Sequence, residues 1–262
     1  MVLVMDVGNT NIKIGLFNDD KLTETWRVAT NISHTADEYG MTLKNLLSNV
    51  GLNFSDIEGV IISSVAPTLN YTLEHMCSYY MHITPIMVGP GVKTGIHVKY
   101  ADPAQVGADR IVNAVGAYNL YGGPCIVIDF GTATTFGVMT ENGEFLGGAI
   151  CPGIKSSMEA LVNTTAKLPR IELKRPDKVV NRTTVTNMQS GIVYGFIGMV
   201  EYLIKKIKKE LNLTNCKVIA TGGMGQIIAK DIPEIDKLDR TLTLKGLKII
   251  YNLNKDSKSE EI

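Results

Sequence analysis

The sequence has no excess of charge of either sign, because 26 lysines and arginines balance 26 aspartates and glutamates among its 262 residues. Nucleic-acid-binding domains usually carry a basic surface, so the composition argues against that class of function. A long apolar run is missing as well. The opening stretch Met1–Met5 stops at Asp6 and is too short for a signal peptide or a membrane span. We therefore expect a cytoplasmic protein that binds neither nucleic acid nor a membrane.

Paired metal-binding or redox cysteines are also missing. The cysteines are far apart with no Cys-x-x-Cys pair, and the histidines show no His-Glu-x-x-His spacing. These residues are Cys77, Cys125, Cys151 and Cys216, and His34, His75, His82 and His97. We expect the cysteines to be reduced thiols in or near the core, and the histidines to lie on surfaces or helix faces.

The common glycine-rich nucleotide loops are absent too. There is no Walker A loop, and the glycines at 222, 223 and 225 do not have the Rossmann spacing. The turn Thr221-Gly222-Gly223 can still let a flat base or a ribose approach the backbone. It can equally be a tight turn between a strand and a helix, and the sequence leaves both interpretations open.

The chain does contain one sequence motif that occurs twice. An apolar run leads into Asp6-Val7-Gly8-Asn9-Thr10, and a second one leads into Asp129-Phe130-Gly131-Thr132. Each is followed by another apolar run, which predicts a buried β-hairpin. One copy could be an ordinary turn. Two copies favour phosphate-binding loops, because glycine lets a ligand approach while hydroxyls and backbone N–H groups hold its oxygens.

The remaining pattern is an alternation of short apolar strands and helices, which predicts an α/β sheet with a parallel portion. We expect helices near 35–50, 69–80, 103–121, 154–166, 185–207, 226 onward and 242–253, and strands at 21–29, 60–65, 85–88 and 216–220. Residues 168–181 should form an exposed loop, and the charged tail Asn254–Ile262 should be disordered. The repeat suggests two similar halves facing each other across a cleft, with the boundary near Ala114–Gly123.

The segment Gly107-Ala108-Asp109-Arg110, at the start of a buried helix, is the best candidate for the reacting centre. Asp109 could be there for the helix dipole or as a partner of Arg110. An arginine at a helix N-terminus opposes the dipole, however, so Arg110 favours a bound anion. A carboxylate beside a substrate hydroxyl can act as a general base, and a guanidinium can hold a carboxylate through two hydrogen bonds.

These motifs resemble a known family. Duplicated Asp-x-Gly loops with a late Thr-Gly-Gly turn are similar to the superfamily of acetate and sugar kinases, heat-shock ATPases and actin. More narrowly, the chain resembles the type III pantothenate kinases. The matching segments, in the family's order, are Asp6–Asn11, Tyr100 with Asp102-Pro103, Gly107–Arg110 with Asn113, Asp129–Thr134, Gly147–Gly153, Thr184 with Gln189–Gly191, and Thr221–Gly223.

The resemblance implies an α/β fold of two actin-like (ribonuclease H-like) domains, each a mixed sheet flanked by helices, around a central nucleotide cleft. Domain 1–115 would carry the first phosphate loop. Domain 116–262 would carry the second phosphate loop and the adenosine-side turn. The implied activity is ATP-dependent phosphorylation of pantothenate to 4'-phosphopantothenate, the first step of coenzyme A biosynthesis.

The family's functional residues can be placed on this sequence by position. ATP with Mg²⁺ would bind to Asp6, Val7, Gly8, Asn9, Thr10, Asn11, Ile12, Lys13 and Thr132, with Asp6 near the magnesium ion through water. Pantothenate would contact Tyr100, Gly107, Ala108, Asp109, Arg110 and Thr184, and Asp109 would be the general base. Asp129 would help to bind a monovalent cation, K⁺ or NH₄⁺. The resemblance also implies a homodimer with the active site at the interface.

The chain departs from the family's usual pattern at Asn181, Thr183 and Asn187, around Thr184. Two other functions also fit the fold: a kinase or phosphatase for a different small acceptor, and a non-catalytic regulatory or transcriptional accessory protein. Loss of Asp6, Asp109 or Asp129 would favour the regulatory protein, and all three are present.

Overall fold

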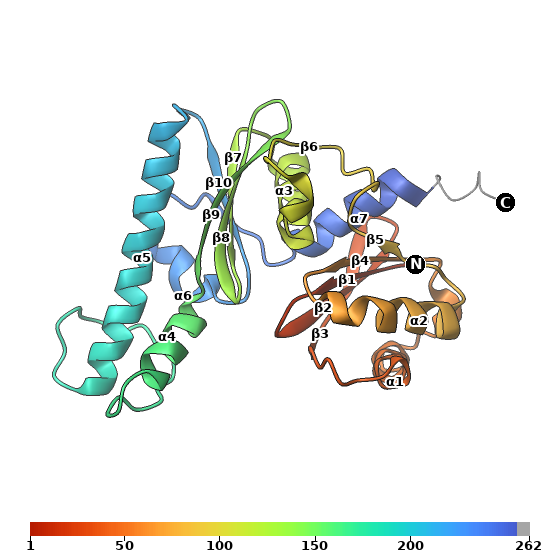
Figure 1. The fold of residues 1–262 in the computed structure, drawn as a ribbon, viewed down its shortest axis with the longest axis horizontal. Helices are drawn as coiled ribbons and strands as arrows, with labels where there is room; N and C mark the ends of the chain where they lie inside the picture. The colour runs from red at the N-terminus through yellow and green to blue at the C-terminus, as the bar shows by residue number, and fades with distance from the viewer. Residues whose placement is uncertain (256–262) are drawn as a thin grey trace. The chain divides into compact units, whose positions relative to one another are not determined.

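The computed structural model describes residues 1–255, which form two compact units (Figure 1). Unit 1 comprises residues 1–96, 101–116 and 241–255, and unit 2 comprises residues 97–100 and 117–240. Of the expected disordered tail, residues 256–262 lie outside the described part, whereas Asn254 is the last residue of a helix. Within residues 1–255 no helix is long and apolar enough to cross a membrane.

Unit 1 is built on a five-stranded mixed sheet of order β3-β2-β1-β4-β5. The strands are β1 (Val2–Val7), β2 (Asn11–Asn18), β3 (Lys21–Ala29), β4 (Gly59–Ser64) and β5 (Ile86–Met87). β1, β2 and β3 pair antiparallel, as the hairpin pattern predicts, while β4 and β5 continue parallel to β1. The mixed sheet expected from the resemblance is confirmed.

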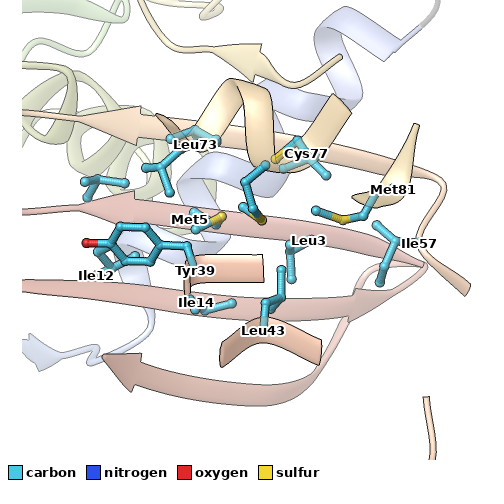
Figure 2. Close-up of a cluster of buried hydrophobic side chains, with 14 of the residues drawn as sticks. Leu3, Met5, Ile12, Ile14, Tyr39, Leu43, Ile57, Leu73, Cys77 and Met81 are labelled. Carbon is cyan, nitrogen blue, oxygen red and sulfur yellow. The ribbon is translucent and has the colours of Figure 1, made fainter. Parts of the chain in front are cut away.

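One face of this sheet is covered by α1 (Ala36–Ser48) and α2 (Asn70–Met81). Figure 2 shows Leu3 and Met5 of β1 packed among side chains of these helices, including Leu43 and Leu73. Helix α1 begins where the sequence predicts, because Thr35 and Glu38 form a reciprocal capping box.

The opposite face is covered by α7 (Leu242–Asn254). Cβ atoms placed on Gly15 and Gly59 would meet Leu244 and Tyr251 of this helix, so the two glycines make room for it. The sequence places a helix here but assigns it to the second domain, and this assignment is wrong. Its apolar side chains complete the core of unit 1, so the first unit is discontinuous in sequence.

Helix α3 (Ala108–Tyr121) contains the boundary between the units at residues 116 and 117. Asp102 caps a short 3₁₀ helix, Pro103–Gln105, by accepting a hydrogen bond from the Ala104 N–H at 3.1 Å. Asp102 therefore caps only this short helix and not α3. The continuous helix expected from Pro103 onward is wrong, because Val106 and Gly107 interrupt it.

Unit 2 repeats the strand order of unit 1 and adds one strand, giving β11-β10-β7-β8-β9-β6. The strands are β6 (His97–Val98), β7 (Cys125–Phe130), β8 (Ala133–Met139), β9 (Glu144–Pro152), β10 (Lys217–Thr221) and β11 (Lys237–Leu238). β7, β8 and β9 pair antiparallel, and β10 and β11 run parallel to β7. The short strands β6 and β11 carry too little pattern to be predicted from sequence.

The helices of unit 2 pack on the face of its sheet that carries Phe130 and Phe136. They are α4 (Ile154–Asn163), α5 (Thr184–Glu210) and α6 (Gly225–Ile228), of which α5 is the long helix in Figure 1. The segment between α4 and α5 has neither helix nor strand, as predicted for 168–181. It is held to α5 by side chains of the helix: Gln189 donates to Glu172 O at 2.8 Å, and Tyr194 donates to Pro176 O at 2.7 Å.

Candidate active-site residues in each unit

Asp6 lies near the carboxyl end of β1, on the sheet face that α7 covers, and is 7% exposed. Two neighbouring strands supply its contacts. Lys13 of β2 places Nζ 3.2 Å from Oδ2, and Ser63 of β4 donates a long hydrogen bond to Oδ1 at 3.4 Å. Burying a carboxylate is costly unless it is paired in this way. Ser63 carries no motif, and the signal for it is a hydroxyl at the end of a predicted buried strand.

The loop after Asp6 is held in a defined shape while its side chains face outward. Its backbone closes through a hydrogen bond from Gly8 N–H to Asn11 O at 3.1 Å. Thr30 anchors it from the end of β3, with Oγ1 donating to Gly8 O at 2.6 Å and N–H donating to Thr10 O at 3.0 Å. Asn9, Thr10 and Asn11 are exposed. The loop therefore presents amide and hydroxyl groups to a ligand without having to order itself first.

Asp109 lies in the first turn of α3, in unit 1 with Asp6. Its Oδ1 is 2.6 Å from where a Cβ on Gly107 would be, and that position is also 3.7 Å from Val65, directly after β4. Val65 in turn donates its N–H to Val7 O at 3.0 Å. Asp109 thus lies at the edge where β1 and β4 end, the edge that carries Asp6. A side chain at Gly107 would push the Asp109 carboxylate from this position.

Arg110 follows Asp109 and is only 9% exposed, which is unusual for arginine. Its backbone N–H donates to Gly107 O at 3.0 Å and to Asp109 Oδ1 at 2.8 Å. The second hydrogen bond fixes one oxygen of the Asp109 carboxylate. The first turn of α3 therefore orients the carboxylate through the backbone.

The second hairpin places Asp129 near the end of β7. Its turn is held by the segment that begins α4: Gly153 N–H donates to Thr132 O at 3.1 Å, and Ser156 Oγ donates to the same oxygen at 2.8 Å. This turn is one residue shorter than the first, because Phe130 pairs with Thr134, whereas Val7 pairs with Ile12. The two loops therefore share a position for the aspartate but differ in the backbone groups that follow it.

The turn Thr221-Gly222-Gly223 packs directly on this second loop. Gly222 has a φ of +94°, and a Cβ there would collide with Asp129 Oδ1 and lie 2.5 Å from the Phe130 nitrogen. Of the two interpretations left open by the sequence, this contact supports the tight turn. The glycine is needed so that the end of β10 can lie against the Asp129 carboxylate.

The remaining pantothenate candidates fall in unit 2. Tyr100 is 36% exposed and lies against Gly147 of β9. Thr184 is the first residue of α5, after Thr183, which caps the helix by accepting from Thr186 N–H at 3.2 Å. One of the departures from the family pattern, Thr183, is therefore the residue that starts this helix. Gly107–Arg110 and the first loop belong to unit 1.

Cation chemistry at these positions must rely on few carboxylates. Within residues 1–255 no group of three or more His, Cys, Asp or Glu side chains is arranged to hold a metal ion. Mg²⁺ bound with nucleotides is typically held by one or two carboxylates together with phosphate oxygens and water. A single buried carboxylate such as Asp6, beside an exposed loop, fits that mode of binding.

Comparison with known sequences agrees with these features. The family model described as type III pantothenate kinase matches residues 2–206. Type III pantothenate kinases from Geobacillus sp. (strain WCH70) and Geobacillus thermodenitrificans (strain NG80-2) are each 52% identical over 258 residues. Both matches cover 98% of this chain and 100% of the relative.

Comparison with solved structures shows the fold. A Campylobacter jejuni protein named as a candidate Baf family transcriptional activator has a TM-score of 0.62 at 20% identity, over 97% of this chain and 99% of that one. An inorganic polyphosphate/ATP-glucomannokinase from Arthrobacter sp. strain KM has a TM-score of 0.50 at 11% identity, over 97% and 98%. The chain has the actin-like fold of ATPases and sugar kinases. Identities this low carry no conclusion about activity.

Proposed function

Because the chain belongs to the type III pantothenate kinase family, we propose that it transfers the terminal phosphoryl group of ATP to pantothenate with Asp109 as the general base. The family is one of kinases that phosphorylate pantothenate for coenzyme A biosynthesis. The observation that supports Asp109 is its place at the sheet edge where β1 and β4 end, shared with Asp6.

The chemistry assigned to Asp109 is a single proton transfer. As the primary hydroxyl of pantothenate attacks the terminal phosphorus, the carboxylate accepts the hydroxyl proton, and ADP leaves with the electrons of the broken P–O bond. The backbone N–H of Arg110 holds one carboxylate oxygen at 2.8 Å and so orients the group that accepts the proton. Arg110, Gly107, Ala108, Tyr100 and Thr184 are assigned to pantothenate, with the guanidinium facing its carboxylate.

ATP is assigned to the loop Asp6–Lys13 and to Thr132. The exposed Asn9, Thr10 and Asn11 and the ammonium group of Lys13 suit phosphate oxygens. Asp6 would hold Mg²⁺ through water, and the ion would neutralise charge on the phosphates as the P–O bond breaks. We assign the monovalent cation to Asp129, against which Gly222 places no side chain of its own.

We also propose that the protein is a cytoplasmic homodimer. Val179 and Val180, which precede the first turn of α5, are 64% and 87% exposed, and Val185 is 40% exposed. Clustered exposed apolar side chains usually mark an interaction surface. Analytical ultracentrifugation should give twice the chain mass, and Val180→Asp should shift the equilibrium toward the monomer. A monomeric wild-type protein would overturn this part of the proposal.

The second candidate function is the regulatory accessory protein that also fits the fold. A coupled assay of ADP release, with and without pantothenate, separates the two. Pantothenate-dependent ADP is expected. Nucleotide binding without pantothenate-dependent ADP would favour the regulatory protein, and ADP release that depends on another alcohol would indicate a different acceptor.

A further inference from the structure

Each unit holds its aspartate at the equivalent place of a similarly ordered sheet. The order β3-β2-β1-β4-β5 in unit 1 matches β9-β8-β7-β10-β11 in unit 2. Asp6 and Asp129 are each the second-last residue of the central strand, β1 or β7. Residues that pair with each aspartate on the neighbouring strands can therefore be compared position by position.

On the parallel neighbour, both aspartates face a hydroxyl residue. Ser63 pairs with Asp6, and Thr221 pairs with Asp129. On the antiparallel neighbour the two units differ, because Lys13 pairs with Asp6 and Thr135 pairs with Asp129. Register partners point to the same face of a sheet. In the first unit this position carries the positive charge of Lys13, whereas in the second unit it carries the hydroxyl of Thr135.

The hydroxyl of Thr221 is buried without a hydrogen-bond partner among the described residues. The residue is fully buried at 0% exposure, and Oγ1 has no hydrogen-bond partner within residues 1–255. Ser63 differs, because its hydroxyl donates to Asp6. A buried polar atom without a partner costs stability, and such atoms usually serve a bound water, an ion or a ligand.

We propose that Thr221 is a further residue of the cation site at Asp129, with its hydroxyl oxygen supplied to the bound monovalent cation. This inference rests on the proposed assignment of that cation to Asp129. The cation would take the place that the ammonium group of Lys13 occupies beside Asp6.

The chemistry of the position favours an alkali or ammonium cation over an anion. Asp129 contributes negative charge, and Thr221 and Thr135 contribute hydroxyl oxygens on the same face. Monovalent cations are bound in proteins by carboxylate, carbonyl and hydroxyl oxygens. A phosphate oxygen placed among these groups would instead be repelled by the carboxylate. Gly222 prevents a side chain from filling the space next to Asp129.

The test uses a substitution that should not lower stability in the absence of potassium but should weaken the stabilisation by potassium. Thr221→Val keeps the size of the side chain but removes the unpartnered hydroxyl. In choline chloride the Tm of this variant should be no lower than that of the wild type, and any increase should be about 2–4 °C. When potassium chloride replaces choline chloride at equal ionic strength, the wild type should gain several degrees, because a ligand that binds only the folded state stabilises it. Thr221→Val should lose most of that gain, and Thr221→Ser should recover it.

A matched control lies on the other face of the same sheet. Thr134 of β8 pairs with Phe130, is 1% exposed, and its Oγ1 also has no hydrogen-bond partner among the described residues. Thr134→Val should not lower Tm in choline chloride, and it should keep the wild-type gain in potassium. A wild-type potassium gain in Thr221→Val would overturn the proposal, as would an equal loss in Thr134→Val.

The outcomes also separate this inference from the broader function. If the wild type gains no stability from potassium, both the cation at Asp129 and the role of Thr221 are wrong. Pantothenate-dependent ADP release would then still stand on its own. If potassium stabilises the wild type but no pantothenate-dependent ADP appears, the kinase assignment fails while the Thr221 site survives.

Discussion

Lys13 reaches across the β1–β2 pair and places its ammonium nitrogen 3.2 Å from a carboxylate oxygen of Asp6. The side chains of Lys13 and Asp6 are 23% and 10% exposed, so the pair is largely shielded from water. The carboxylate that we assign to Mg²⁺ is therefore already partly neutralised in the protein without ligand. Binding of MgATP would let Lys13 turn from Asp6 toward a phosphate, with the ion replacing it at the carboxylate.

The first prediction concerns this pair. Lys13→Met should lower the free energy of unfolding by ~1–3 kcal/mol, because a mostly buried carboxylate loses its counter-charge. Added Mg²⁺ should raise the Tm of the variant more than that of the wild type, because the ion no longer competes with the ammonium group. Chemical denaturation and thermal melts with and without MgCl₂ measure both effects.

The control for Lys13 is an exposed pair of the same chemistry. Lys155 lies 3.7 Å from Glu159, with the two side chains 60% and 56% exposed. Lys155→Met should change stability by less than ~0.5 kcal/mol, because such surface pairs contribute little. If Lys13→Met behaves like Lys155→Met, Lys13 does not stabilise the Asp6 carboxylate.

The second prediction tests the base. Asp109→Asn keeps the shape of the side chain and should retain the fold and ATP binding, but it cannot accept the hydroxyl proton. Turnover should fall ~10²–10⁴-fold, the usual contribution of general-base assistance. Steady-state ADP release and nucleotide titration measure the two properties separately. Asp177→Asn, at an exposed position, is the matched control, and near-normal kcat in Asp109→Asn would remove Asp109 from the role.

The third prediction separates backbone strain from crowding of Asp129. Gly222 and Gly122 both have positive φ, +94° and +80°, but a Cβ on Gly122 would meet nothing within 4 Å. Gly122→Ala should therefore cost only the strain, ~1–2 kcal/mol. Gly222→Ala adds the collision with Asp129 and Phe130 and should cost ~1–3 kcal/mol more. It should also lose the stabilisation by potassium, which Gly122→Ala should keep.

Equal losses of stability in the two glycine variants would contradict that contrast. They would mean that the end of β10 relaxes away from Asp129 without cost. Urea denaturation of the wild type and both variants in potassium and in choline chloride gives the six free energies that are needed.

The fourth prediction concerns the thiols and pH. Burial raises the pKa of Cys77 and of Cys125 to about 12, and it also raises the pKa of Cys216. Cys151 is half-buried. Iodoacetamide at pH 8 should therefore modify the folded protein mainly at Cys151, because a thiolate is the reactive form. Mass spectrometry of the wild type and of Cys151→Ser measures this, and rapid labelling of Cys125 in folded protein would contradict the burial.

The same shifts make stability depend on pH in a defined direction. In the unfolded chain a thiol titrates near pH 8.5, whereas buried Cys77 and Cys125 keep their protons until about pH 12. Their contribution is complete below the unfolded pKa and is lost as pH rises toward the folded value. The free energy of unfolding should thus fall between about pH 8.5 and 12, and Cys77→Ala with Cys125→Ala should flatten that part of the curve.

Much of the fold follows from local signals in the chain. The alternating apolar residues around Asp6 and Asp129 predict both hairpins, because strand periodicity and turn residues act over a few positions. Thr35 and Asp102 mark helix starts for the same reason, since a cap bonds within one turn. The helix at 242–253 is equally visible. Its place in unit 1 is not, because an apolar helix face does not say which sheet it will cover.

In the candidate site, too, some residues can be predicted from local sequence motifs and others cannot. Asp6, Asp109, Asp129 and their glycine-rich neighbours carry their chemistry in short motifs and could be named from the sequence. Ser63 could not, since it is an ordinary hydroxyl at the end of an apolar strand, and Thr221 could be named only as part of the Thr-Gly-Gly turn and not as a neighbour of Asp129. Parallel pairing with a strand far away in the sequence puts them beside the aspartates.

By itself, then, the sequence determined the two aspartate hairpins, the helix that carries Asp109, and the family to which they belong. Only the tertiary structure decided that α7 completes the first unit, that Lys13 pairs with the carboxylate of Asp6, and that the buried Thr221 pairs with Asp129 across the sheet. The physical reason is the separation along the chain of the residues that interact. Turns, caps and periodicity act between residues a few positions apart, whereas burial and strand pairing join residues that the chain order leaves far from one another.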